Sequence, residues 1–328
     1  MSERQPLIEL VNVSKEYRIR NRSNPFLKRS IRAVDGLSLA ICPGEVFGLV
    51  GESGCGKSTT GQMLAGIFPP SSGEIRYRGK SVKQMTAEEK RAMRREIQIV
   101  LQDPYASLNP KRRIGWIVEE PLVIHTKLDR RERRKRVEEM METVGLDAGY
   151  LSAFPHELSG GQRQRVNIAA ALMLDSKFLV ADEPVSALDV SIQSQILNLL
   201  KSLKETRNLT YLFISHDLNV VQYMSDRIGV MYLGRLVECG GVEDVYGDPR
   251  HPYTRALLSA VPSVAESARK RILLSGEVPS LLDPPSGCAF HTRCSRAAPV
   301  CAQAAPEMKQ IGDGHWARCR FAEETGKE

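Results

Sequence analysis

Short apolar runs alternate with longer amphipathic segments along most of this chain. The runs whose length and apolar character predict buried strands are 46–50, 97–101, 177–182 and 211–214. The segments 114–175 and 190–205 repeat apolar residues at helical spacing, and Pro121 and Pro155 predict breaks within the first of them. Strands that alternate with helices indicate an α/β fold on a mainly parallel sheet, whose ligands bind at the carboxyl ends of the strands.

The pattern differs at the two ends of the chain. Residues 7–13 alternate loosely and predict a strand, and 33–50 contain two strand candidates separated by a Pro-Gly turn signal at 43–44. Near residue 250 the content of Pro, Ser, Ala and Cys rises and the helical periodicity fades. We therefore expect a domain boundary at about 248–262, followed by a small and irregular appendage.

Composition narrows the class of protein. The chain has 328 residues, of which 26% are charged and 42% hydrophobic, as in globular proteins of two domains. It lacks an apolar run long enough to span a membrane and an apolar core at its start, so we expect neither a membrane span nor a secretion signal. The net charge of +7 comes partly from a basic run at 130–136. Because no aromatic residues interleave it, we interpret this run as an ion-paired helix face and expect no nucleic-acid partner.

The segment 51–58 reads Gly-Glu-Ser-Gly-Cys-Gly-Lys-Ser and fits the pattern G-x-x-x-x-G-K-[ST] at every position. It follows a predicted strand and precedes a predicted helix, so glycine-rich backbone N–H groups and a helix start can hold a phosphate. Lys57 can reach the β- and γ-phosphates of a nucleoside triphosphate, and the Ser58 hydroxyl can bind Mg²⁺. The predicted nucleotide-binding residues here are Gly51, Glu52, Ser53, Gly54, Cys55, Gly56, Lys57, Ser58 and Thr59.

Four polar residues end other predicted strands. Asp182 can hold Mg²⁺ together with Ser58 and Gln102, and the adjacent Glu183 can activate an attacking water. The alternative is an acidic pair that caps the next helix. Gln102 and His216 would ordinarily be structural residues, but in this order along the chain both become catalytic candidates.

A second glycine-rich segment lies at Ser159, Gly160, Gly161 and Gln162 and begins a predicted helix at about 163–174. Ser159 can cap that helix, and the glycines leave N–H groups bare for an anion. The alternative is a glycine-rich helix start without a ligand.

Four of the seven cysteines cluster near the C-terminus, at Cys288, Cys294, Cys301 and Cys319. In a chain expected to stay in the cytoplasm, such a cluster favours a metal over disulfides, and four thiolates suit Zn²⁺ or a four-iron cluster. Unliganded cysteines in a loose tail are the alternative.

Six of these motifs in this order resemble the nucleotide-binding subunit of an ATP-binding cassette (ABC) transporter. They are 51–58, Gln102, 158–162, Asp182-Glu183, Ser186-Ala187-Leu188-Asp189 and His216. The resemblance covers residues 5–250 and implies a P-loop NTPase fold with a RecA-like core, an antiparallel β subdomain and a helical subdomain at about 103–175.

The resemblance also implies how the parts act. Two such subunits stack head to tail, with ATP between 51–58 of one and the Ser159 segment of the other. Tyr17 matches the aromatic residue that stacks on adenine, Glu183 the catalytic base and His216 the contact to the γ-phosphate. Asp189 matches the loop that couples the two sites.

Residues 251–258 and 286–294 resemble the C-terminal extension of oligopeptide and dipeptide permease ATPases, and residues 102–110 and 119–122 resemble the dipeptide-permease "F" type. This implies an extension at 251–328, a [4Fe-4S] cluster on the four cysteines with Zn²⁺ as the alternative, and ATP hydrolysis coupled to import of di- or oligopeptides. The implied partners are a second, homologous ATPase subunit, two transmembrane permease subunits and an extracytoplasmic solute-binding protein, on the cytoplasmic side of the membrane. Import of nickel chelates or another small solute, or a cassette ATPase acting on nucleic acid or the ribosome, are the alternatives.

Overall fold

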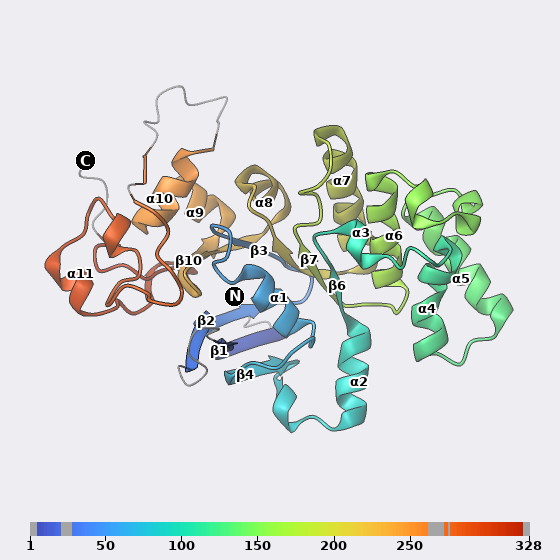
Figure 1. The fold of residues 1–328 in the computed structure, drawn as a ribbon, viewed down its shortest axis with the longest axis horizontal. Helices are drawn as coiled ribbons and strands as arrows, with labels where there is room; N and C mark the ends of the chain where they lie inside the picture. Colours follow the sequence, from blue (N-terminus) through green and yellow to red (C-terminus); the bar gives the residue numbers. More distant parts are fainter. Residues whose placement is uncertain (1–4, 21–27, 262–271, 275, 324–328) are drawn as a thin grey trace.

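The computed structural model of the protein describes residues 5–20, 28–261, 272–274 and 276–323. A large sheet crosses the middle of the molecule, a small sheet lies below it in Figure 1, and a group of helices lies at one end. The C-terminal segments lie at the opposite end, beside the last strands of the large sheet. No helix within the described ranges is both long and apolar enough to cross a membrane.

The large sheet has the order β11-β12-β10-β9-β3-β8-β7-β6, and its strands from β9 to β6 are parallel. These parallel strands are β3 (Val46–Val50), β6 (Ile97–Val100), β7 (Phe178–Asp182), β8 (Thr210–Ile214) and β9 (Arg227–Tyr232). All residues of β3, β7 and β8 are buried, because helices or the small sheet cover both faces. This explains why the strands appear in the sequence as continuous apolar runs.

The far edge of the large sheet is antiparallel and includes the C-terminal extension. Strand β10 (Arg235–Gly241) pairs with β9 on one side and with β12 (His315–Ala317) on the other. Strand β11 (Lys309–Gly312) pairs with the outer side of β12 and forms the edge of the sheet. This C-terminal region thus contributes two strands to the large sheet, which the sequence pattern did not predict.

The small sheet is antiparallel in the order β2-β1-β4-β5. Its strands are β1 (Ile8–Arg20), β2 (Lys28–Ile41), β4 (Ser72–Tyr77) and β5 (Lys80–Ser81). Its apolar face shares one hydrophobic core with Phe47, Leu49 and Leu212 of the large sheet. The predicted Pro-Gly turn at 43–44 separates β2 from β3.

Two of the longer helices begin at residues whose side chains cap the first turn. Asp129 and Ser159 each form a reciprocal capping box with the residue three positions later. The α-helices are α1 (Lys57–Leu64), α2 (Ala87–Glu96), α3 (Pro104–Ser107), α4 (Ile114–His125), α5 (Arg130–Thr143), α6 (Gly160–Leu172), α7 (Val190–Arg207), α8 (Leu218–Met224), α9 (Val242–Gly247), α10 (Pro252–Ser259) and α11 (Pro299–Gln303). The 3-10 helices are η1 (Val82–Gln84), η2 (Ala148–Ser152), η3 (Pro155–Glu157) and η4 (His291–Arg293).

The predicted helix break at Pro121 was wrong. Helix α4 continues through this residue to His125. A proline removes only one N–H donor from the helix ladder, and burial of Ile117, Val118 and Leu122 in the core offsets that loss. Pro155 does interrupt the helical pattern, since it starts a 3-10 turn between α5 and α6.

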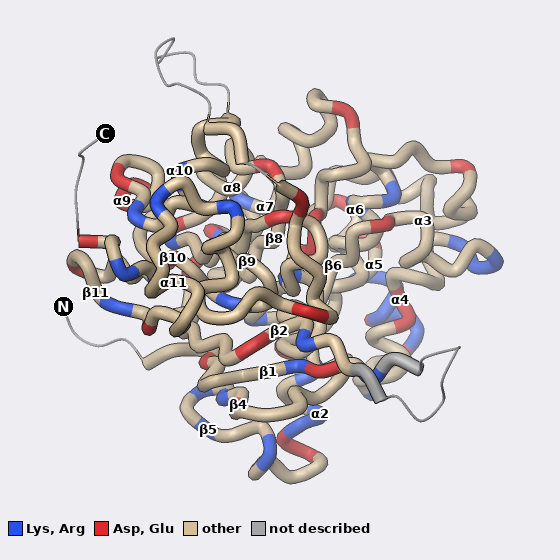
Figure 2. Tube along the Cα trace, turned by 60° about the vertical axis from the view of Figure 1, so that its left-hand side comes forward, with Lys and Arg blue, Asp and Glu red and all other residues tan. Residues whose placement is uncertain are grey.

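The basic run at 130–136 lies on α5 and forms ion pairs, as the sequence predicted. Arg133 pairs with Glu119 at 2.7 Å, and Arg134 pairs with Glu138 one turn later at 3.0 Å. Basic and acidic residues are interspersed over the rest of the surface as well (Figure 2). The charge on α5 is therefore largely satisfied within the protein.

Candidate active site

The segment 51–58 forms a tight loop between β3 and α1. Gly51, Gly54 and Gly56 have φ angles of 149°, 77° and 105°, which residues other than glycine rarely adopt. A Cβ on Gly51 would lie 2.2 Å from the carbonyl oxygen of Met231, and one on Gly56 would lie 2.3 Å from that of Ala33. The loop therefore requires glycine at these two positions for both conformation and space.

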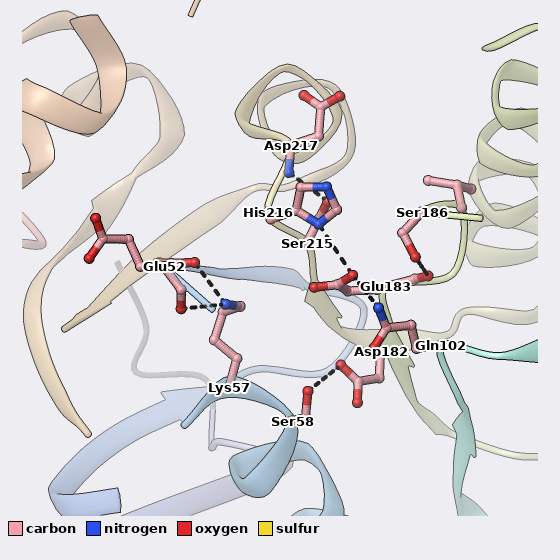
Figure 3. Close-up of polar contacts among 12 residues, drawn as sticks. Glu52, Lys57, Ser58, Gln102, Asp182, Glu183, Ser186, Ser215, His216 and Asp217 are labelled. Carbon is pink, nitrogen blue, oxygen red and sulfur yellow. Dashed lines mark hydrogen bonds and ion pairs between the residues drawn. The ribbon is translucent and has the colours of Figure 1, made fainter. Parts of the chain in front are cut away.

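Lys57 lies inside the curve of this loop. Its Nζ donates to the carbonyl oxygens of Gly51 at 2.7 Å and Glu52 at 3.1 Å, as Figure 3 shows. The side chain is 5% exposed. These partners are neutral carbonyls, so the ammonium keeps its full positive charge for an incoming phosphate. Lys57 Nζ also lies 3.8 Å from Sγ of the buried Cys55, whereas Ser53 is exposed.

Ser58 and Asp182 meet although 124 positions separate them. Ser58 Oγ donates to Asp182 Oδ1 at 2.9 Å, at the carboxyl end of β7. Burial raises the pKa of Asp182, and the charge of Glu183 raises it further, against the opposing hydrogen bond from Ser58. A hydroxyl and a carboxylate on one side of a phosphate loop fit Mg²⁺, which takes one or two such ligands beside phosphate oxygens. A cation there would relieve the cost of the buried charge.

Glu183 is the centre of a second group of contacts. Its Oε2 accepts a hydrogen bond from Gln102 Nε2 at 2.8 Å and lies 3.2 Å from His216 Nδ1. The backbone of Glu183 has a φ of 49°, an uncommon value for a residue with a side chain, and Ser186 Oγ donates to its carbonyl oxygen. Three residues predicted from separate strand ends are thus joined at one carboxylate (Figure 3).

The structure places Gln102 beside Glu183 rather than in contact with Ser58 and Asp182. Its predicted role as a Mg²⁺ ligand therefore stays a prediction.

The carboxylate of Glu183, held by two neighbours on one oxygen, is suited to orient and deprotonate a water.

The segment from Ser159 to Gln162 forms the start of α6. Ser159 Oγ accepts from the backbone N–H of Gln162 at 3.3 Å, and Gln162 Oε1 accepts from the N–H of Ser159 at 2.9 Å. A Cβ on Gly161 would lie 2.5 Å from Ile192 Cγ2, so this helix start packs closely on the first turn of α7. Among the described residues, no hydrogen bond or ion pair joins this segment to 51–58.

Two other predicted residues lie on the surface. Tyr17 is 39% exposed on β1 and its ring packs edge-on against Phe68, with centroids 6.0 Å apart. Asp189 is exposed at the start of α7, and its side chain forms no capping hydrogen bond there. The stacking role of Tyr17 and the coupling role of Asp189 stay predictions.

The four clustered cysteines lie close enough to influence one another. Burial raises the pKa of Cys288, and the nearby Cys301 raises it further; Cys294 and Cys319 are affected in the same way by burial and neighbouring cysteines. However, within the described ranges no three His, Cys, Asp or Glu side chains come together as a metal site. In this arrangement the cysteines do not fit a metal or an iron–sulfur cluster.

Sequence reasoning missed two residues that contact the phosphate loop. Tyr253 Oη accepts a hydrogen bond from the N–H of Glu52 at 2.9 Å, and Arg293 forms a bidentate ion pair with the Glu52 carboxylate at 2.9 and 3.2 Å. Both residues belong to the C-terminal extension, about 200 or more positions away along the chain. No local pattern identified them.

Comparison with known proteins identifies the family. Residues 34–186 match the profile "ABC transporter", and 237–301 match "Oligopeptide/dipeptide transporter, C-terminal region". The chain is 46% identical to the oligopeptide transport ATP-binding protein AppF of Bacillus subtilis (strain 168), over 98% of each sequence. This chain belongs to the ABC transporter ATPases. The family explains why the phosphate loop, Asp182-Glu183 and the Ser159 segment occur in one chain.

Other relatives and solved structures agree with this ABC ATPase assignment. The dipeptide transport ATP-binding protein DppF of Escherichia coli (strain K12) is 47% identical, covering 94% of this chain and 92% of its own. A dimeric ATP-binding cassette in a post-hydrolysis state bound to ADP and phosphate superposes with a TM-score of 0.64 and 31% identity, over 72% of this chain and 98% of that one. The cassette fold is thus established for this ATPase.

Proposed function

We propose that this ATPase is the energising subunit of an importer of di- or oligopeptides. One observation carries the proposal: Gln102 and His216 both contact the carboxylate of Glu183, beside the Ser58–Asp182 pair and next to the phosphate loop. The peptide cargo is supported by the names of its relatives, which are oligopeptide and dipeptide transport ATP-binding proteins at 46–47% identity. A match of the C-terminal region to the corresponding transporter profile adds to this support.

In the proposed reaction, a water oxygen attacks the γ-phosphorus of ATP. The bond from that phosphorus to the bridging oxygen breaks, the water proton passes to the Glu183 carboxylate, and ADP and phosphate leave. Gln102 and His216 hold the carboxylate, and Lys57 neutralises phosphate charge. Mg²⁺, when held by Ser58 and Asp182, supplies further neutralisation of the phosphates.

The proposed ATPase needs a second cassette subunit to complete its ATP site. The Ser159 segment presents a capped, glycine-rich helix start, and within the part of the chain that the structure describes it makes no hydrogen bond to its own phosphate loop. We infer that it is available to the ATP of a homologous partner subunit. Two chains stacked in this way would close on ATP and separate after hydrolysis. We infer that this movement drives two transmembrane permease subunits at the cytoplasmic side of the membrane, with cargo supplied by an extracytoplasmic solute-binding protein.

An iron–sulfur cluster, with zinc as the alternative, stays our prediction for Cys288, Cys294, Cys301 and Cys319. Their number and their shared neighbourhood support it, since neighbouring cysteines add to the burial that raises the pKa of Cys288, Cys294 and Cys319. Binding would require the thiols to come closer together than they do in this structure. Anaerobic purification followed by iron and sulfide analysis tests the prediction; a colourless protein with one equivalent of zinc would favour the alternative, and a metal-free protein would refute both.

The substitution Glu183→Gln tests the proposed base. It keeps the shape and the contact with Gln102 but removes the proton acceptor, so we expect ATP binding to persist and hydrolysis to fall by roughly 10²- to 10⁴-fold. The measurement is ATP turnover by the purified chain together with its co-expressed partner subunits. Glu205→Gln, at an exposed position of α7, is the matched control. Turnover by Glu183→Gln at the rate of the wild type would show that another group is the base.

A further inference from the structure

The C-terminal extension is attached to the phosphate loop at one residue, Glu52. Tyr253, on α10, accepts the backbone N–H of Glu52 through its hydroxyl at 2.9 Å. Arg293, in η4, binds the carboxylate of the same residue through both terminal nitrogens at 2.9 and 3.2 Å. The Arg293 side chain is 7% exposed and that of Glu52 25%, so the pair is largely withdrawn from solvent. A bidentate arginine–carboxylate pair of this kind fixes orientation as well as charge.

Both residues are held firmly from behind by the aromatic side chains of Tyr232 and Phe290. The ring of Tyr232, on β9, lies 4.6 Å from that of Tyr253 and 5.2 Å from that of Phe290. Arg293 Nη1 also reaches the Tyr232 hydroxyl at 3.5 Å. Tyr232, Tyr253 and Phe290 are almost fully buried, so the contacts to Glu52 come from a rigid surface and not from a loosely attached tail.

These contacts act on the part of the loop that receives phosphate. Lys57 Nζ donates to the carbonyl oxygen of Glu52, so the peptide units on either side of Glu52 are fixed at the same time, one by Tyr253 and the other by Lys57. An unpaired carboxylate at Glu52 would add negative charge beside the triphosphate and compete for the ammonium of Lys57. Arg293 cancels that charge where it arises.

We propose that Tyr253 and Arg293 are positioning residues that hold the phosphate loop, through Glu52, in the form that accepts ATP. The proposal rests on the ATP site described above. It assigns the C-terminal extension a direct part in nucleotide affinity, through residues other than the four cysteines. Neither residue touches the reacting atoms, so the extension acts on binding of ATP and leaves the chemical step to Glu183.

The test measures the ATPase activity and ATP affinity of the full chain assembled with its partner subunits. Tyr253→Phe keeps the buried ring and removes only the hydroxyl, and we expect it to raise the KM for ATP about fivefold. Arg293→Gln removes a charged, bidentate partner and should raise the KM about tenfold or more. In both variants kcat should stay within about twofold of the wild type, since the groups around Glu183 are unchanged.

A double-mutant cycle tests whether Arg293 acts on the KM through Glu52 or through a general disturbance of the fold. Once Glu52→Gln has removed the charge, adding Arg293→Gln should change the KM no further. Arg320→Gln, at an exposed arginine of the same extension, and Tyr223→Phe, at a half-exposed tyrosine of α8, are the matched controls and should leave the KM unchanged.

Three results would overturn the proposal: an unaltered KM in both single variants, an equal effect of Arg293→Gln with and without Glu52→Gln, or a loss confined to kcat. A wild-type assembly that neither binds nor hydrolyses ATP would instead refute the proposed function.

Discussion

The glycines of the phosphate loop offer a sharp steric test, because the structure gives them different surroundings. At Gly56, alanine would need a φ of 105° and would place its Cβ 2.3 Å from a backbone oxygen that cannot swing aside. Strain and overpacking together predict a loss of about 3–5 kcal/mol in the free energy of unfolding. At Gly54, φ is 77° and nothing in the protein lies within 4 Å of the new Cβ, so only the left-handed conformation costs, about 1 kcal/mol.

The assay combines denaturant unfolding of the nucleotide-free chain with titration by ATP. We expect Gly56→Ala to lower both the unfolding free energy and the affinity for ATP. Gly54→Ala should retain nearly all of the stability yet still lose affinity, because a methyl group added inside the phosphate loop would compete for space with a bound phosphate. The free energy of unfolding and the affinity for ATP should therefore both fall in Gly56→Ala, whereas only the affinity should fall clearly in Gly54→Ala.

Gly247→Ala is the matched control, since this helical glycine also has nothing within 4 Å of its added Cβ and has no positive φ. It should be neutral or stabilise by up to about 1 kcal/mol. Equal destabilisation by Gly54→Ala and Gly56→Ala would refute the steric reasoning. Unchanged ATP affinity in Gly54→Ala would show that the phosphate lies elsewhere.

Three further predictions concern stability. Burial lowers the pKa of His251 to about 4, so between pH 6.5 and 4 the histidine is protonated in the unfolded chain but neutral in the native one. The free energy of unfolding should therefore fall by up to about 3 kcal/mol over this range. In unfolding curves of His251→Asn this pH-dependent loss should be absent. Pro121→Ala should raise the unfolding free energy by about 2 kcal/mol by restoring a donor within α4, as thermal or denaturant melts would reveal. Ser159→Ala should cost about 1 kcal/mol by removing the cap of α6, whereas Ser159→Thr should retain most of it in the same melts.

The core of the candidate site was predictable because it is built at the ends of buried strands. Asp182 ends β7, Glu183 comes directly after it, and His216 follows β8, so a parallel sheet had to bring them to one edge. The contacts from Gln102 and His216 to the same oxygen of Glu183 could not be read from the sequence. They depend on side-chain orientation and on the strained backbone of Glu183.

Features set by distant parts of the chain were not predictable. The pairing of Glu52 with Arg293 joins residues 241 positions apart and depends on how the irregular extension folds back. Pro121 misled the helix prediction because a local preference was overridden by burial of its neighbours. The four cysteines predicted a shared neighbourhood but not the spacing of their side chains in this structure.

The pairing of β12 with β10 has a consequence for how the protein is made. Glu238 and Cys239 of β10 face Ala317 and Trp316 of β12, and β10 is buried along most of its length. Until β12 is synthesised, β10 presents unpaired backbone groups beside apolar side chains, an edge that readily recruits strands from other chains. A chain released from the ribosome before residues 309–317 would therefore expose this edge and tend to aggregate, so these strands protect the large sheet against pairing with other chains.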